Sequence, residues 1–123
     1  MRAAVPFSSN IGLNRVAFKT IGCRLNQAET AQMAAEFEAA GYRVVPFGEP
    51  CEVAVVHTCA VTRHAEKVCV RTARLARRLG GEPLVVLAGC AVEVDARALQ
   101  EASGADVVVR QADKFRLHAI LRQ

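Results

Sequence analysis

Short apolar segments and longer amphipathic segments alternate along nearly the whole chain, and this alternation constrains the fold more than any other feature. The apolar segments predict strands at residues 15–21, 42–47, 53–56, 84–88 and 105–109. The amphipathic segments predict helices at residues 25–40 and 113–121, and from candidate caps at Thr62 and Asp95 to residues 79 and 102. This order predicts an α/β fold: an open, mostly parallel five-stranded sheet flanked by helices, a three-layer arrangement of the flavodoxin-like or Rossmann-like type.

The length of the chain is that of one domain. Its 123 residues, 52% of them hydrophobic and 23% charged, are enough to bury a core without disulfides. Residues 1–14 follow neither pattern, so we expect an irregular leader there and a domain over residues 15–123. The strand order around residues 42–56 stays open, because this link is short for a parallel crossover.

The sequence shows no targeting or membrane segment. The longest apolar run, residues 84–92, is too short to cross a bilayer, and no secretory signal is recognised at the N-terminus. We therefore expect a cytoplasmic protein with no membrane partner. Sixteen Lys and Arg against twelve Asp and Glu give a net charge of +4, which permits an anionic partner such as RNA without requiring one.

Five cysteines are spread along the chain, at positions 23, 51, 59, 69 and 90. Their spacing contains no C-x-x-C, which excludes a zinc ribbon, a thioredoxin-type pair and a ferredoxin-type run. An odd number of cysteines in a reducing compartment also argues against disulfides. Any shared site must therefore be assembled by the fold.

Three of these cysteines, Cys23, Cys59 and Cys90, each follow a predicted strand. If the strand order is flavodoxin-like, 2-1-3-4-5, their strands are neighbours and the thiols converge beyond the carboxyl ends. Helix N-termini at this edge lower the pKa of thiols, and three thiolates would leave one metal position open. The alternative is that each is an ordinary buried cysteine, which is the role we expect for Cys51 and Cys69.

Three segments around these cysteines resemble the signatures of the methylthiotransferases, sulfur-inserting radical S-adenosylmethionine enzymes. They are residues 22–29 (GCRLNQAE), 58–62 (TCAVT) and 88–91 (AGCA). Residues 106–114 resemble the closing strand and turn of the family's N-terminal domain. The similarity extends from about Val16 to Leu121, which is nearly the whole chain.

The resemblance implies that Cys23, Cys59 and Cys90 bind an auxiliary [4Fe–4S] cluster whose open iron carries the sulfur that is transferred. It places Asn26 near the cluster, although a helix cap, in a capping box with Glu29, is an equally good reading. The family's radical S-adenosylmethionine barrel, with C-x-x-x-C-x-x-C, and its RNA-binding β-domain are absent from this chain. S-adenosylmethionine would bind only with that barrel, in cis or in trans, so the chain alone is not a complete enzyme.

Residues 26–30 and 59–62 are most similar to the class that acts on threonylcarbamoyladenosine in tRNA. Other classes modify isopentenyladenosine in tRNA or an aspartate of a ribosomal protein. Two residues depart from the family pattern: His57 stands where Asn is usual, and Glu93 where Gln is common. His57 has two interpretations, a hydrogen bond to a cluster sulfur or a loop histidine with protein partners.

The second predicted helix has a basic face formed by Arg63, Lys67, Arg71, Arg74 and Arg78. Its packing stripe is predicted to be Val68, Thr72, Leu75 and Leu79. The basic face is either a contact for an RNA backbone or a solvated surface. Aromatic residues make up 5% of the chain and none is Trp, so no base-stacking platform is evident and we expect weak tRNA binding by this domain alone.

Two other functions remain open. One is a non-catalytic iron–sulfur or metal-binding module, which is consistent with the missing barrel. The other is a flavodoxin-like domain that binds a small ligand at the same sheet edge without metal. The sequence contains neither G-x-G-x-x-G nor G-K-[ST], which argues against a phosphate-binding loop.

Overall fold

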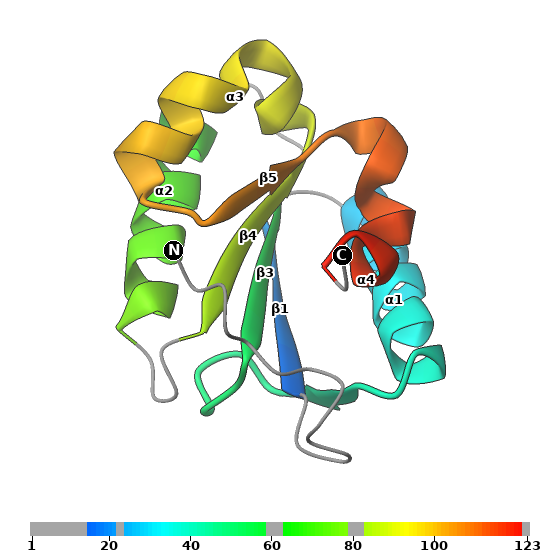
Figure 1. Ribbon diagram of the computed structural model, residues 1–123. Helices are drawn as coiled ribbons and strands as arrows, with labels where there is room; N and C mark the ends of the chain where they lie inside the picture. Colours follow the sequence, from blue (N-terminus) through cyan, green and yellow to red (C-terminus); the bar gives the residue numbers. More distant parts are fainter. Residues whose placement is uncertain (1–14, 22–23, 59–62, 79–82, 122–123) are drawn as a thin grey trace.

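The computed structural model describes residues 15–21, 24–58, 63–78 and 83–121. These residues form a five-stranded sheet in the order β2-β1-β3-β4-β5 (Figure 1), and every neighbouring pair is parallel. The strands are β1 (Arg15–Ile21), β2 (Arg43–Val45), β3 (Val53–Thr58), β4 (Leu84–Gly89) and β5 (Val107–Val109). The predicted fold class and the flavodoxin-like strand order are therefore confirmed.

Helices cover both faces of the sheet. They are α1 (Arg24–Ala39), α2 (Arg63–Arg77), α3 (Cys90–Ser103), the 3-10 helix η1 (Gln111–Arg116) and α4 (Leu117–Ile120). Figure 1 shows α1 and α4 on one side of the strands and α2 and α3 on the other, which gives three layers. In the described parts of the chain, no helix has the length and apolarity that crossing a membrane requires.

Alternate residues of β3 pack into two separate cores. Val53 and Val55 are buried on the α1 side, while Ala54 and Val56 are buried on the α2 and α3 side. A strand buried on both faces explains the uninterrupted apolar run in the sequence. Each buried valine stabilises the fold by roughly 2 kcal/mol.

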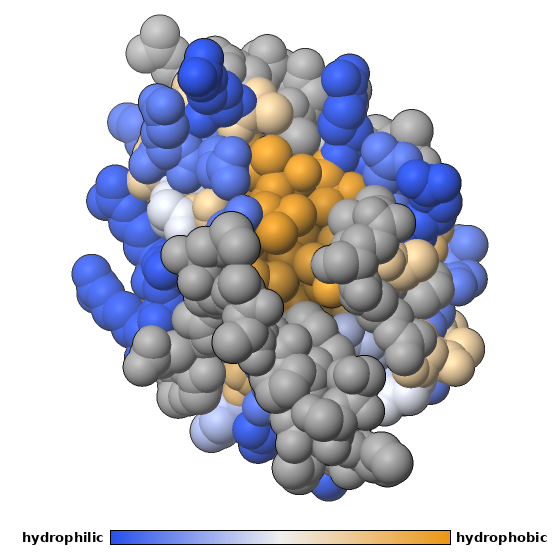
Figure 2. All heavy atoms as spheres, in the orientation of Figure 1, coloured by the Kyte–Doolittle hydropathy of each residue, from blue (hydrophilic) through white to orange (hydrophobic). Residues whose placement is uncertain are grey.

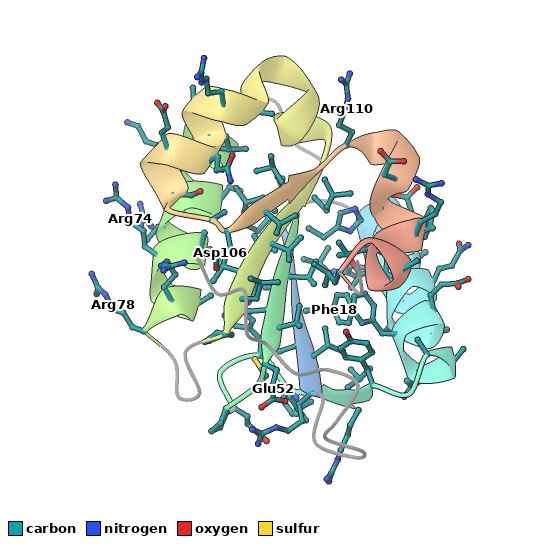
Figure 3. All side chains as sticks on the ribbon, in the orientation of Figure 1. Phe18, Glu52, Arg74, Arg78, Asp106 and Arg110 are labelled. Atoms are coloured by element: carbon teal, nitrogen blue, oxygen red, sulfur yellow. The ribbon has the colours of Figure 1, made fainter. Side chains whose placement is uncertain are left out.

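Aromatic side chains extend the core on the α1 side. Phe18 of β1 (Figure 3) meets Phe37 of α1 edge to face, with ring centroids 5.6 Å apart. The Phe37 ring in turn meets the Tyr42 ring, with centroids 4.8 Å apart.

At the β5 edge of the sheet, Figure 2 shows hydrophobic atoms over β4 and β5, between hydrophilic side chains. The half-buried Leu84 and Val107 belong to these two strands.

Helix α2 packs against the sheet through its smallest side chains. Cys69, Ala73 and Ala76 are fully buried, whereas Leu75 is 51% exposed. The predicted packing stripe is therefore wrong for Leu75, whereas Val68 and Thr72 are half-buried and Leu79 lies outside the described residues. Small residues at the contact let the helix approach the strands and α3 closely, which the larger side chains would prevent.

Two helices begin earlier than the sequence predicts. Helix α3 starts at Cys90, directly after β4, so that Asp95 lies inside the helix and does not cap it. Helix α1 starts at Arg24, which places Asn26 in its first turn and not at the cap. The capping-box interpretation is therefore wrong, and Glu29 bonds the ammonium of Lys114 instead, a stronger partner for a carboxylate than a backbone amide.

The short link between β2 and β3 is explained by the register of the sheet. Val44 and Val53 both pair with Val16 of β1, from opposite sides. The link therefore has to cross two strand spacings, about 10 Å, with little travel back along the strands. Residues 46–52 span this distance without a helix, which resolves the strand order that the sequence left open.

The amino ends of β1 and β3 are joined by an ion pair. Arg15 Nη2 donates to Glu52 Oε2 at 2.7 Å, and the Arg15 backbone N–H donates to Glu52 Oε1 at 2.6 Å. Figure 3 shows Glu52 at this end of the sheet. Partial burial alone would raise the pKa of Glu52, but the bonds from Arg15 outweigh it and lower the pKa.

We expect Glu52→Gln to reduce the free energy of unfolding at neutral pH by about 1 kcal/mol, because water screens this partly exposed pair. A lowered folded-state pKa means that the contribution is present above the unfolded pKa of about 4.3 and is lost as the pH falls through the folded pKa. Urea titrations at decreasing pH should show the two proteins converging in acid. Glu49→Gln, the same change at an exposed position, should leave stability unchanged, and a pH-independent loss in Glu52→Gln would contradict this assignment.

Candidate functional site

The carboxyl ends of the three central strands lie side by side. Ile21 of β1 pairs with Thr58 of β3, and Thr58 pairs with Gly89 of β4. These three residues therefore form one row, with neighbours about 5 Å apart. The sequence continues from this row to the three predicted ligands: Cys90 is the first residue of α3, while Cys23 and Cys59 lie outside the described residues.

Gly89 turns β4 directly into α3. Its φ of +117° and ψ of −166° belong to a region that essentially only glycine adopts. A Cβ placed on it would lie 1.7 Å from the backbone oxygen of Thr58. This close approach puts the start of α3, and with it Cys90, beside the end of β3. A helix N-terminus at this point favours negative charge.

A cluster of polar side chains lies just behind this row, on the α1 side of the sheet. Lys114 of η1, 2% exposed, donates to Glu29 Oε1 of α1 at 2.5 Å, and its Nζ lies 3.3 Å from His57 Nε2. Thr30 Oγ1 lies 2.8 Å from His57 Nδ1 and accepts a bond from Thr20. We call Thr20, Glu29, Thr30, His57 and Lys114 the polar cluster. It joins β1, α1, β3 and η1.

The contacts of His57 define its tautomer. A lysine ammonium can only donate, so His57 Nε2 is the acceptor and Nδ1 carries the proton toward Thr30. His57 is fully buried within β3, which corrects its placement in a loop. Both ring nitrogens have protein partners, so a bond to a cluster sulfur would require one of these contacts to break, and that role stays a prediction.

The other predicted residues are distributed as follows. Cys51 precedes β3 at the opposite edge of the sheet and Cys69 lies in α2; both are buried free thiols. Burial, with the nearby Glu52, raises the pKa of Cys51, which makes that thiol unreactive. The side chains of Asn26, Arg63 and Glu93 lie outside the described set. Within that set, no three His, Cys, Asp or Glu residues are grouped as a metal site.

Thr58 carries a further polar group at the row of strand ends. Its Oγ1 is buried and has no hydrogen-bond partner among the residues that the structure describes. A buried hydroxyl without a partner is costly. This hydroxyl stands one residue before Cys59.

Sequence reasoning missed most of the polar cluster. Lys114 is 85 residues from Glu29 and 57 from His57, so no local pattern joins them. The only sequence signals were the unusual His57 and the resemblance of residues 106–114 to the family's closing segment. Neither signal identifies a contact.

Curated relatives carry methylthiotransferase names. Threonylcarbamoyladenosine tRNA methylthiotransferase MtaB of Aquifex aeolicus is 34% identical over 109 residues, covering 89% of this chain and 27% of that protein. Its namesake in Bacillus subtilis is 30% identical, with 88% and 24% covered. Ribosomal protein uS12 methylthiotransferase RimO of Salinispora arenicola is 37% identical, with 71% and 17% covered. The chain thus spans between 17% and 27% of the length of these relatives.

The chain is therefore similar, over most of its own length, to one portion of proteins that are named tRNA or ribosomal protein methylthiotransferases. The chain belongs to the family described as Uncharacterized protein family UPF0004, whose model matches residues 15–110. That match includes all five strands and α1 to α3. No solved structure matches the chain.

We expect Gly89→Ala to reduce the free energy of unfolding by at least about 3 kcal/mol, because the new Cβ meets the Thr58 carbonyl and the backbone is strained. Urea unfolding followed by circular dichroism measures this loss. Gly41→Ala is the matched control: its φ is +100° but nothing lies within 4 Å of the added Cβ, so it incurs the strain alone. Equal losses in the two variants would show that the contact with Thr58 does not matter.

We expect Lys114→Met to reduce the free energy of unfolding by about 2 kcal/mol, because it leaves Glu29 and His57 without their shared donor. Combining it with Glu29→Gln should recover part of the loss in a double-mutant cycle. Arg116→Met, which removes an exposed pair with Asp113, should have little effect. Additive effects of the Lys114 and Glu29 changes would argue against their coupling.

Proposed function

We propose that this domain binds the auxiliary [4Fe–4S] cluster of a tRNA methylthiotransferase, with Cys23, Cys59 and Cys90 as its ligands. The observation that carries the proposal is the row formed by Ile21, Thr58 and Gly89. Each predicted ligand follows one of these residues within two positions of the sequence. Thiols on three adjacent strand ends are the arrangement that the proposal needs.

The residues at this edge fit a cluster in three respects. Thiolates are the usual ligands of iron–sulfur clusters, and three of them leave one iron without a protein ligand. The Thr58 hydroxyl supplies a hydrogen-bond donor of the kind that tunes cluster sulfurs. Gly89 has no side chain, so the backbone at the start of α3, where Cys90 stands, can lie directly against the backbone of Thr58. When bound, the cluster would supply the sulfur for methylthiolation.

The chain's own residues position the elements that carry the ligands. Helix α1 begins one residue after Cys23, and Glu29 in its second turn is held by Lys114. Strand β3 ends one residue before Cys59, and His57 is held by Thr30 and Lys114. The polar cluster therefore ties together the two elements that adjoin Cys23 and Cys59.

We further propose threonylcarbamoyladenosine in tRNA as the nucleoside that is modified. Two relatives with that name align with 89% and 88% of the chain, at 34% and 30% identity. The short motifs at residues 26–30 and 59–62 favour the same class. S-adenosylmethionine would be bound by a separate radical S-adenosylmethionine module, joined in cis or supplied in trans.

We expect anaerobic reconstitution with iron and sulfide to load about four of each per chain, with the broad visible absorption of an iron–sulfur cluster. Cys23→Ala, Cys59→Ala and Cys90→Ala should each abolish this loading, because each removes one of three ligands. Cys51→Ala and Cys69→Ala are the matched controls, since both thiols are buried away from the row of strand ends. Loss of iron in Cys69→Ala equal to that in Cys59→Ala would contradict the ligand assignment.

Reconstitution, followed by an assay of tRNA methylthiolation, separates the alternatives. A cluster that forms but yields no methylthiolated tRNA, even with a radical S-adenosylmethionine module supplied, would indicate a non-catalytic iron–sulfur module. A folded chain that binds no iron would favour a small-ligand domain at the same edge. The first result would overturn the assignment to a methylthiotransferase, and the second would overturn the cluster itself.

A further inference from the structure

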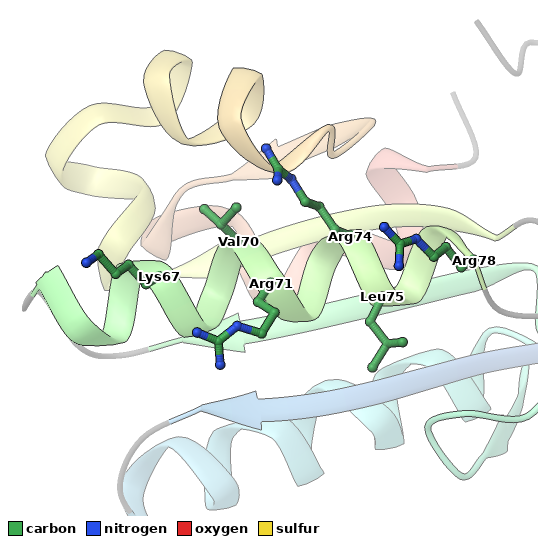
Figure 4. A pocket seen from close by; sticks show the side chains of 6 residues that line it. All are labelled: Lys67, Val70, Arg71, Arg74, Leu75 and Arg78. Carbon is green, nitrogen blue, oxygen red and sulfur yellow. The ribbon is translucent and has the colours of Figure 1, made fainter.

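We propose that the outer surface of α2 is a docking groove for the phosphate backbone of RNA. A pocket of about 640 Å³ lies on this surface (Figure 4), lined by Lys67, Val70, Arg71, Arg74, Leu75 and Arg78. We call it the α2 groove. The choice of RNA over another polyanion rests on the proposed function; the existence of an anion-binding groove does not.

All the charged residues that line the α2 groove are positive. Four of its six lining residues are cations, and none is acidic. Among the described residues, no carboxylate forms an ion pair with any of the four, whereas the neighbouring Arg77 is paired with Asp106 at 3.0 Å. The cations of the groove are thus left for an external anion, and a row of like charges is the electrostatic feature that phosphates complement.

Arg74 is held in place before any ligand arrives. Its Nε and Nη2 both donate to the backbone oxygen of Ala102 in α3, at 3.0 and 2.8 Å. Figure 4 shows the side chain extending from α2 toward α3. A guanidinium fixed in this way loses little conformational entropy on binding, and its remaining N–H donors suit a phosphate.

Two apolar residues line the α2 groove beside the cations. Val70 lies between the cations, and Leu75 is 51% exposed. These surfaces match the apolar faces of ribose and bases. No aromatic residue lines the groove, so stacking contributes nothing and the binding should be independent of sequence.

The groove runs along the helix. Lys67 stands near the start of α2, on the side of the strand carboxyl ends, and Arg78 stands beyond its other end (Figure 4). These two positions are about 16 Å apart along the helix axis, long enough for several phosphates. An RNA strand lying in the α2 groove would therefore lead toward the edge where the cysteines follow their strands.

The test is the affinity of the 123-residue chain for a fluorescein-labelled RNA stem–loop, measured by anisotropy at several salt concentrations. We expect Arg71→Gln with Arg78→Gln to weaken binding about tenfold at low salt and to reduce the slope of log K against log salt by about 1 to 2. The matched control is Arg43→Gln with Arg116→Gln, which removes the same charge from exposed residues of β2 and η1. It should retain the affinity.

Three results would overturn the inference. They are an unchanged RNA affinity in the groove variant, an equal loss of affinity in the control variant, and displacement of the labelled RNA by polyglutamate as effectively as by unlabelled RNA. Iron and sulfide content, measured on the same preparations, separates this inference from the proposed function. Groove-dependent RNA binding without a cluster would support the α2 groove and overturn the cluster. If a cluster forms and the groove variant binds RNA as tightly as the unchanged chain, the cluster would be supported and the α2 groove overturned.

Discussion

The parallel register of β1, β3 and β4 is the constraint on which the rest of the structure depends. Val16, Val53 and Leu84 stand in one row near the amino ends, and Ile21, Thr58 and Gly89 in another at the carboxyl ends. Because parallel pairing holds strands in step, the three chain segments leave the sheet at one level. A slip of one residue would move every side chain of a strand to the opposite face.

The polar cluster is a second constraint on the structure. Burying a lysine is tolerated only when its ammonium is paired and hydrogen-bonded. Lys114 meets this condition through Glu29 and His57, and the segment after β5 must fold back over the α1 side of the sheet to bring it there. Because leaving any of these buried groups unpaired would cost free energy, the cluster favours one set of hydrogen bonds over others. It thereby holds α1 and the end of β3 in one arrangement.

Helix α2 shows how packing decides which residues remain for function. Alanines and Cys69 occupy the contact with the sheet, so the long cations and Leu75 point outward. On the opposite side of the molecule, Met33 and Phe37 of α1 fill the core. The two faces of the sheet are therefore covered differently, and the α2 side carries a groove lined by four cations.

The sequence by itself determined the fold class, the strand positions and the placement of three cysteines after three strands. Those features are local, because apolar strand segments, helical periodicity and glycine turn signals each involve only a few neighbouring residues. Strand order around β2, the start of α3 at Cys90, the inward face of α2 and the partners of His57 were decided only by the tertiary structure. They depend on contacts between residues far apart in the chain, where burial and pairing override local preference.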